Sequence, residues 1–160
     1  MNLRKLILLC FLGLMSCEKD DICLEGTEGT PRMIVLFKDY NDPLISKAVN
    51  ELTIIGLDQE SNYQIFSGDS MAIPLRNNFD ITQYKLVLDA DTEKQTSDSI
   101  QINHKQFDIY INRSCGYKSN YIFGNPPYFI LTQGNGWIKS IAIIKDTITD
   151  ERSSHLAIYH

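Results

Sequence analysis

Hydrophobic residues recur along the chain in short stretches separated by turn-forming residues, a pattern that predicts β-strands. The run at 32–37 is almost continuously apolar, as expected for a strand buried on both faces. Strands are predicted at 32–37, 51–57, 62–66, 71–75, 84–89, 107–112, 128–132, 137–144 and 154–159.

Two of these stretches alternate between apolar and polar residues. Side chains two residues apart share one face of a strand, so alternation predicts one buried and one solvated face. In 84–89 the predicted inward residues are Tyr84, Leu86 and Leu88. In 107–112 they are Phe107, Ile109 and Ile111.

Turn residues suggest how neighbouring strands connect. Ser67-Gly68-Asp69 predicts a hairpin between 62–66 and 71–75, and Gly134-Asn135-Gly136 predicts one between 128–132 and 137–144. Residues 44–50 could form about one helical turn, but no long amphipathic helix is indicated.

Many short strands with regular turns favour an all-β fold, and we predict a single antiparallel β-sandwich, immunoglobulin-like or similar, over residues 31–160. A small β-barrel is the competing architecture. The pattern contains no sign of a second domain or an internal repeat.

The first 16 residues have the features of a signal peptide. Arg4 and Lys5 precede an apolar run that ends at Met15 and Ser16, before Cys17. A membrane-spanning helix needs about 20 apolar residues, so this run is too short to be one. We therefore expect cleavage after residue 16 and a flexible tether at 17–30.

Leu14-Met15-Ser16-Cys17 resembles the lipobox of bacterial lipoproteins, in which the cysteine is acylated and becomes the new N-terminus. The resemblance implies lipidation of Cys17, with attachment strengthened by about 0.8 kcal/mol per buried CH₂. The large Met15 departs from the usual pattern. The alternative is an ordinary secretory signal in which the cysteine is incidental.

The polar segment Glu18-Lys19-Asp20-Asp21 resembles the acidic export tag that directs Bacteroidota lipoproteins to the outer face of the outer membrane. That resemblance implies a cell-envelope location with outward display. A solvated linker is the alternative, because short charged runs usually serve that purpose.

The formal net charge is −5 over 160 residues, and loss of Arg4 and Lys5 would make it more negative. An acidic chain without a cluster of lysines and arginines is unsuited to nucleic acid. It also lacks a basic patch for lipid headgroups, so any membrane attachment should come from the lipid.

Four cysteines are present, at positions 10, 17, 23 and 115. If Cys10 leaves with the leader and Cys17 is acylated, Cys23 and Cys115 remain as a pair for a disulfide in an oxidising compartment. The closed loop of about 90 residues would contribute roughly 4 to 5 kcal/mol in the chain-entropy model. Two free thiols or an intermolecular bridge are the alternatives.

Beside the lipobox, three segments carry a family resemblance: Asp21-Ile22-Cys23, Thr30-Pro31-Arg32-Met33-Ile34 and Ser114-Cys115-Gly116-Tyr117. With them the chain resembles a family of small uncharacterised Bacteroidota lipoproteins. The resemblance covers nearly all of residues 17–160 and implies a single β domain with paired cysteines. It implies no activity and no catalytic residue.

No catalytic motif is found in the sequence. Gly68-Asp69-Ser70 is an incomplete nucleophile elbow that is better explained as a turn. His104 is expected in a loop and His160 at a frayed end, and neither these nor His155 has a nearby nucleophile pattern. The spacings of zinc, calcium, phosphate-loop and dinucleotide sites are missing, so we expect no metal and no cofactor.

Three positions match the Asp-Ser/Thr-apolar acceptor that is used for O-glycosylation of exported Bacteroidota proteins: Ser70, Ser99 and Thr147. The same dipeptides also mark turns, so both interpretations remain open.

Aromatic residues gather between Cys115 and Trp137, around Pro126 and Pro127. Exposed aromatics can stack on sugar rings or anchor a protein contact. The candidate binding residues are Tyr117, Tyr121, Tyr128 and Trp137. Burial in the core is the competing interpretation, because aromatics are also favoured in strands.

Taken together, these features predict a lipid-anchored envelope protein that binds an envelope protein or a glycan, or that has a purely structural role. A hydrolase acting on envelope polymers or glycans is the alternative, and a pocket that joins two carboxylates would favour it.

Overall fold

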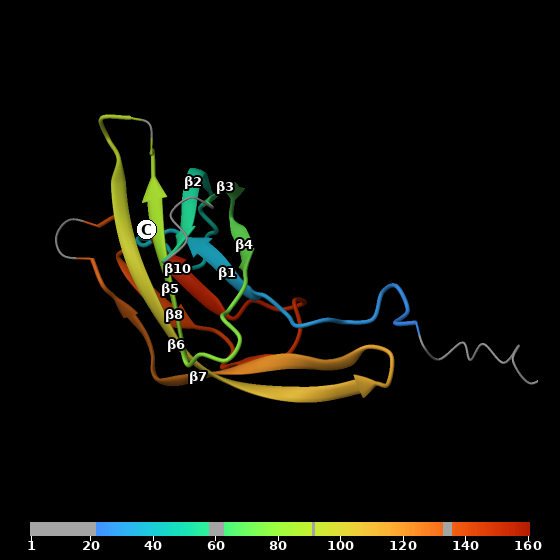
Figure 1. The fold of residues 1–160 in the computed structure, drawn as a ribbon. Coiled ribbons are helices and arrows are strands. Elements are labelled where there is room, and N and C mark those ends of the chain that lie inside the picture. The colour runs from blue at the N-terminus through green and yellow to red at the C-terminus, as the bar shows by residue number, and fades with distance from the viewer. Residues whose placement is uncertain (1–21, 58–62, 91, 133–135) are drawn as a thin grey trace, which may run out of the picture. The chain divides into compact units, whose positions relative to one another are not determined.

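The structure, a computed structural model, describes residues 22–57, 63–90, 92–132 and 136–160. Within these ranges every regular element is a β-strand, and Figure 1 shows their arrangement. The strands are β1 (Met33–Lys38), β2 (Val49–Gly56), β3 (Tyr63–Gly68), β4 (Ser70–Ile73), β5 (Ile81–Leu88), β6 (Thr96–Asn112), β7 (Gly116–Ile130), β8 (Ser140–Ile143), β9 (Thr147–Ile148) and β10 (Leu156–Tyr159). The all-β prediction is confirmed. None of the described segments forms a helix that could span a membrane.

The strands form two sheets in a sandwich-like arrangement, as predicted. One has the order β4-β1-β10-β8 and the other the order β3-β2-β5-β6-β7-β9. Antiparallel pairing dominates both sheets, but β1 and β10 run parallel, with Val35 opposite Leu156. Parallel strands need a long crossover connection, and here the chain between β1 and β10 provides it.

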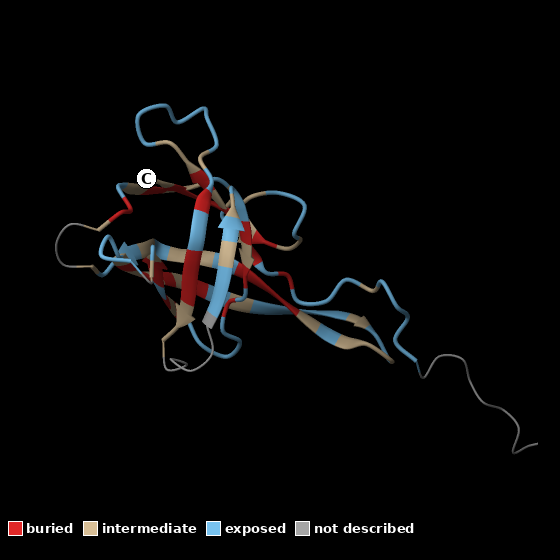
Figure 2. Cartoon of the chain, turned by 90° about the horizontal axis from the view of Figure 1, so that it is seen from above, coloured by how far each residue is buried: buried red, intermediate tan, exposed pale blue. Residues whose placement is uncertain are grey.

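The hydrophobic core takes side chains from both sheets. Alternate residues of β1 are buried, Met33, Val35 and Phe37, and they join Ile100 and Ile102 of β6 in one cluster. Figure 2 shows buried and less buried residues succeeding one another along the strands. This period-two burial is what a strand with one face on a core requires.

The hairpin predicted at Ser67-Gly68-Asp69 is wrong. β3 pairs with β2 in the six-stranded sheet, whereas β4 pairs with β1 in the four-stranded sheet, so the chain crosses between sheets here. Gly68 has φ 150°, and a Cβ added to it would lie 2.8 Å from the ring of Phe66. The glycine permits a sharp crossing rather than a hairpin turn.

The second predicted hairpin is also wrong. Residues 133–135, which include Gly134 and Asn135, lie outside the described residues, but the flanking strands β7 and β8 belong to different sheets. The helical turn expected at 44–50 does not form. The segment contains a turn, an isolated bridge between Lys38 and Ser46, and the start of β2.

The alternation in 84–89 is confirmed, because Tyr84 and Leu86 are buried and Leu88 packs against the core. The inward placement of Phe107, Ile109 and Ile111 is wrong. They lie in β6 as predicted, but Phe107 and Ile109 are each 41% exposed, and Ile111 is only partly buried. The buried positions of β6 are the even-numbered residues from 98 to 104, so the odd-numbered apolar residues fall on the other face.

The chain separates into two units by its internal contacts. The larger one contains the described residues 28–109 and 118–160, and with them both sheets. The smaller one contains the described residues 22–27 together with 110–117. Because β6 and β7 are long strands, each has residues in both units.

Candidate ligand-binding site

The loop of residues 74–80 (loop 74–80) connects β4 to β5 and is fastened by two buried tyrosines. The Tyr84 hydroxyl donates to the carbonyl of Pro74, and the Tyr121 hydroxyl donates to the side chain of Asn77 and to the carbonyl of Leu75. Burial raises the pKa of Tyr84 to about 12 and also raises the pKa of Tyr121. Both hydroxyls therefore keep the protons that they donate to the loop.

Thr82 and His104 also form hydrogen bonds that fix loop 74–80. The Thr82 hydroxyl accepts the backbone N–H of Arg76 at 2.9 Å and lies 2.8 Å from Nε2 of His104. The backbone N–H of His104 donates to the carbonyl of Asp80 at 2.8 Å. His104 is thus a buried residue in the middle of β6, not the loop residue that we predicted. Burial lowers its pKa, so the imidazole is neutral at neutral pH.

Gln106 of β6 also binds loop 74–80, and Asp108 of the same strand holds the Gln106 side chain. Gln106 Oε1 accepts the backbone N–H of Asn78 at 2.8 Å, and Gln106 Nε2 donates to Asp108 Oδ1 at 2.7 Å. Ser119 Oγ donates to the same Asp108 oxygen at 2.8 Å. These bonds from Gln106 and Ser119 hold the pKa of Asp108 below its usual value, so the carboxylate is ionised and fixed in place.

Loop 74–80 and β6 together line an open depression of about 390 Å³, which we call the Phe79–Phe107 depression. Phe79 is 51% exposed and Phe107 is 41% exposed. The guanidinium carbon of Arg76 lies 3.9 Å from the centre of the Phe79 ring, a cation–π contact that orients this ring. The lining residues are Asn78, Phe79, Asp80, Lys105, Gln106, Phe107 and Asp108.

The depression combines exposed aromatic rings with side chains that donate or accept hydrogen bonds. Asp80 and Asp108 provide acceptors, Lys105 provides donors, and the amide of Asn78 provides both. Binding sites for small organic molecules use such mixtures, in which apolar surface contributes affinity and a few polar groups fix orientation.

A second depression, of about 300 Å³, is lined by residues on both sides of an ion-pair network. Glu28 pairs with Lys118 at 3.4 Å and with Arg152 at 2.5 Å. The Arg32 guanidinium pairs with both oxygens of Glu151 and holds the pKa of that carboxyl at about 2. The charged side chains at this second depression therefore pair with one another, and none of the residues that line it is aromatic.

The structure does not bring the four predicted binding aromatics together. Tyr121 has 0% exposure, and Trp137 is buried with its ring N–H donating to the carbonyl of Leu86. Tyr128 is half-buried and donates to the carbonyl of Ile141, while Tyr117, in the smaller unit, is exposed. The prediction of a shared binding surface is therefore wrong for Tyr121 and Trp137, because inward positions of the sheet bury large aromatic rings.

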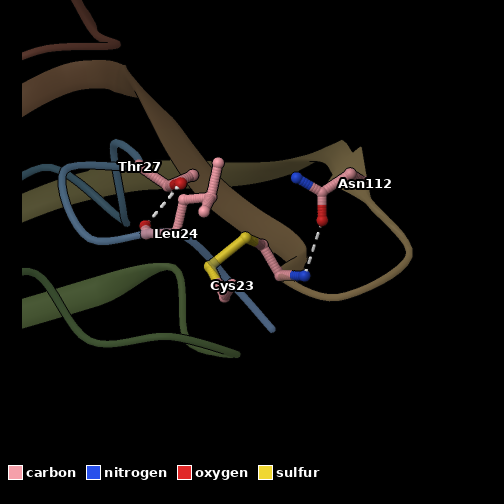
Figure 3. Close-up of a disulfide and its surroundings, with 5 residues drawn as sticks. Cys23, Leu24, Thr27 and Asn112 are labelled. Atoms are coloured by element: carbon pink, nitrogen blue, oxygen red, sulfur yellow. Dashed lines mark hydrogen bonds between the residues drawn. A yellow bond between two sulfur atoms is a disulfide. The ribbon is translucent and has the colours of Figure 1, made fainter. Parts of the chain in front are cut away.

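Cys23 and Cys115 form a disulfide, as predicted, within the smaller unit. Figure 3 shows it beside two local hydrogen bonds, from Thr27 Oγ1 to the carbonyl of Leu24 and from the backbone N–H of Cys115 to the side chain of Asn112. The predicted lipidation site, Cys17, lies outside the described residues, as do the leader 1–16 and the acidic segment 18–21.

The three predicted glycosylation positions lie in different surroundings. Ser70 is exposed on β4, whereas Ser99 and Thr147 are partly buried. The aspartate before Ser99, Asp98, is buried and accepts the backbone N–H of Ile138, which gives it a structural role. Of the three, Ser70 is the most accessible to a modifying enzyme.

The remaining histidines are held in the fold. His155 is buried, and its Nδ1 accepts the backbone N–H of Ile34 at 3.0 Å. His160 is not frayed, because its Nε2 lies 3.0 Å from the carbonyl of Lys47 and its ring contacts the rings of Phe37 and Trp137 edge-on. Among the described residues, no group of three or more histidines, cysteines or carboxylates is placed to hold a metal ion.

Phe79 and Phe107 are the functional candidates that the sequence pattern missed. The sequence pattern predicts Phe107 in the core because this residue begins an apolar alternation, and Phe79 stands alone between polar residues. One feature of the sequence could have indicated the site. Ile100 and Ile102 have even numbers, whereas Phe107 and Ile109 have odd numbers, so within one strand the two pairs lie on opposite faces.

A family model described as a family of unknown function, DUF6452, matches residues 51–160, which is more than half of the chain. No curated protein matches the chain, and no solved structure does. The matched region contains the strands from β3 to β10 and every residue that lines the Phe79–Phe107 depression. The chain belongs to this family of unknown function, DUF6452.

Proposed function

We propose that the chain is an exported lipoprotein of the bacterial cell envelope, anchored to the outer membrane through Cys17, and that it acts there as a non-catalytic binding component. The observation that carries this proposal is the disulfide between Cys23 and Cys115. Disulfides persist in oxidising compartments and are rare in the cytosol. Cys23 follows Cys17 by six residues, so the disulfide would link the segment beside the lipid anchor covalently to Cys115.

The binding role is supported by the Phe79–Phe107 depression, in which Phe107 belongs to strand β6 and Phe79 to a loop that hydrogen bonds hold in place. Preorganised groups bind with a smaller loss of conformational entropy. The partner is an envelope glycan or an envelope protein. A Bacteroidota origin and an outward-facing location follow from the resemblance of residues 18–21 to an acidic export tag.

Metabolic labelling of the full chain in a bacterial host with an alkyne-bearing fatty acid tests the anchor. Wild-type protein should carry the label and remain in the membrane fraction, whereas Cys17→Ala should lose both properties. Cys10→Ala is the matched control, because it removes another cysteine of the proposed leader and should leave the label in place. An unlabelled wild-type protein, or a labelled Cys17→Ala variant, would contradict the proposal.

Protease treatment of intact cells tests the display. Surface-displayed protein should be digested while a periplasmic marker survives. Replacement of Glu18, Asp20 and Asp21 by alanine should protect the protein from digestion without removing its lipid. Equal digestion of this variant and the wild type would show that the acidic segment is only a linker.

Hydrolysis of envelope polymers is the second candidate function, favoured by one observation: Asp80 and Asp108 line the same depression. Glycoside hydrolases use a pair of carboxylates, one of which must be protonated to act as an acid. The lowered pKa of Asp108 is the opposite of what that acid requires. New reducing ends released from neutral oligosaccharides by the wild type, but not by Asp108→Asn, would establish hydrolysis.

A further inference from the structure

We propose that the Phe79–Phe107 depression is a binding site for neutral oligosaccharides, in which one sugar unit stacks on Phe107 and the hydroxyls of another unit bond to Asp108, whose side chain lies on the other face of β6. This inference deepens the proposed binding role and rests on it. It names the ligand class and the residues that would select it.

The aromatic rings are the first line of support. A pyranose ring presents a face of C–H groups that packs on an aromatic face, and burying such surface is favourable. Phe107 leaves 41% of its surface exposed on β6, and Phe79 leaves 51% on loop 74–80. The guanidinium of Arg76 lies over the Phe79 ring, and about half of the Phe79 surface is nevertheless exposed.

The polar groups are the second line of support. Both hydrogen bonds to Asp108, from Gln106 and Ser119, go to Oδ1, and Oδ2 accepts none from the described residues. Oδ2 can therefore accept a sugar hydroxyl while the carboxylate stays fixed. Sugar hydroxyls donate and accept, and they find acceptors in Asp80 and donors in Lys105.

The charges at the depression favour a neutral ligand over an anionic one. The lining residues include two carboxylates, Asp80 and Asp108, and one cation, Lys105. The nearby Arg76 guanidinium lies over the Phe79 ring. An acidic sugar or a phosphate would meet two carboxylates in a chain whose net charge is already −5.

A peptide is less suited to the depression than a sugar. Peptide contacts usually depend on an anchor side chain that is buried in a desolvated pocket. The depression is open rather than enclosed, and Phe79 and Phe107 are the aromatic residues that line it. A sugar, which combines C–H surface with hydroxyls that donate and accept, suits an open site lined by both aromatic and polar residues better.

The test uses the full chain in a sugar-free detergent, because sugar-based detergents would compete. Isothermal titration calorimetry is performed with cellohexaose, xylohexaose, mannohexaose and a hexamer of N-acetylglucosamine. At least one of them should bind, and Phe107→Ala should weaken that binding about tenfold, as expected for the loss of a stacked ring. Phe129→Ala is the matched control, because Phe129 is 45% exposed on β7 but does not line the depression.

Asp108→Asn separates the polar contribution from the stacking contribution. The amide keeps an acceptor for Gln106 and Ser119, so the fold should survive, while a sugar hydroxyl loses its charged acceptor and binding should weaken several-fold. Circular dichroism checks that both variants are folded. If Phe107→Ala does not fold, Phe107→Leu replaces the ring by an apolar side chain and should show the same loss.

The inference is overturned if none of the four sugars binds at millimolar concentration, or if Phe107→Ala binds as tightly as Phe129→Ala. It is also overturned if a tryptic digest of casein contains peptides that bind at Phe107 while no sugar does. The lipid-labelling experiment gives an independent result. Sugar binding without lipidation would leave the site intact and contradict the envelope anchor, and lipidation without sugar binding would do the reverse.

Discussion

The backbone N–H of Ile138 donates to the Asp98 carboxylate at 2.9 Å, although 40 residues separate the two in the chain. Asp98 lies in β6 of the six-stranded sheet, and Ile138 precedes β8 of the four-stranded sheet. The bond therefore ties the connection between the sheets to the middle of the larger one. Asp98 is only 1% exposed, so its carboxylate depends on this partner.

Replacing Asp98 by alanine should destabilise the protein by about 2 kcal/mol, because a buried N–H loses its charged acceptor. Asp98→Asn should cost less, since the amide oxygen can still accept the bond. Urea unfolding followed by circular dichroism measures both values. Equal stability of the alanine variant and the wild type would show that water replaces the carboxylate.

Gly136→Ala should also be destabilising. A Cβ at this position would lie 1.9 Å from Asp98 Oδ1, so the carboxylate or the backbone would have to move, at a cost of about 1 to 3 kcal/mol. Gly29→Ala is the matched control, because a Cβ there meets no atom within 4 Å. Urea midpoints should fall for the first variant only. A similar change in both would mean that the contact with Asp98 is not the cause.

Stability should decrease as the pH falls below about 6.5, the ordinary pKa of histidine. Burial lowers the pKa of both His104 and His155 in the folded state, so the unfolded chain binds protons first. The full stability contributed by the neutral rings is present above pH 6.5 and is lost as the pH falls through the lowered pKa values. Thermal melts between pH 8 and pH 5 measure this loss.

His155→Asn should reduce that pH dependence. The asparagine oxygen can accept the N–H of Ile34 as Nδ1 does, but it does not titrate. The variant and the wild type should therefore differ less in stability at pH 5 than at pH 8. A parallel shift at all pH values would assign the dependence to other groups.

Glu151 should contribute to stability above about pH 4.5 and lose that contribution as the pH falls towards its folded pKa of about 2. The lowered pKa means that the folded state releases the proton more readily than the unfolded chain. Its side chain is 35% exposed and that of Arg32 is 55% exposed, so solvent screening limits the pair to about 1 kcal/mol. Glu151→Gln should be less stable than the wild type at pH 7 and equally stable near pH 2. Glu93→Gln, at an exposed turn position, should change neither value.

Reduction of the Cys23–Cys115 disulfide should lower the urea midpoint of the whole chain. The closed loop spans 92 residues and contains β1 to β6, so its opening increases the entropy of the unfolded chain. The chain-entropy model gives a limit of about 4 to 5 kcal/mol. Fluorescence of Trp137, the single tryptophan, reports the unfolding from the core. An unchanged midpoint in reductant, or in Cys115→Ser, would contradict this prediction.

The first half of β6 shows why part of the fold escaped the sequence pattern. Residues 98, 100, 102 and 104 are all buried, but Asp98 and His104 are polar and interrupt the apolar alternation. The sequence pattern also misses most of β7, because Gly124, Pro126 and Pro127 are residues that strands usually exclude. In both strands the polar or irregular residues are explained by partners distant in the chain, such as Ile138 for Asp98.

The sequence pattern also does not predict the candidate binding site, because the site depends on residues that are distant in the chain. Apolar alternation in Phe107 and Ile109 correctly predicted a strand, but it could not specify which face lies on the core. That choice depends on the parity of the preceding residues Ile100 and Ile102, and on loop 74–80, which lies next to β6 only after the sheets have formed.

The sequence by itself determined the all-β class, the positions of most strands and the pairing of Cys23 with Cys115, because these depend on local alternation and on a small number of cysteines. Only the tertiary structure decided which strands are neighbours, where the chain crosses between sheets, and that Tyr121 is buried while Phe107 is exposed. Strand patterns repeat every two residues and are compatible with many partners, so the partner and the buried face are selected only when the two sheets pack together.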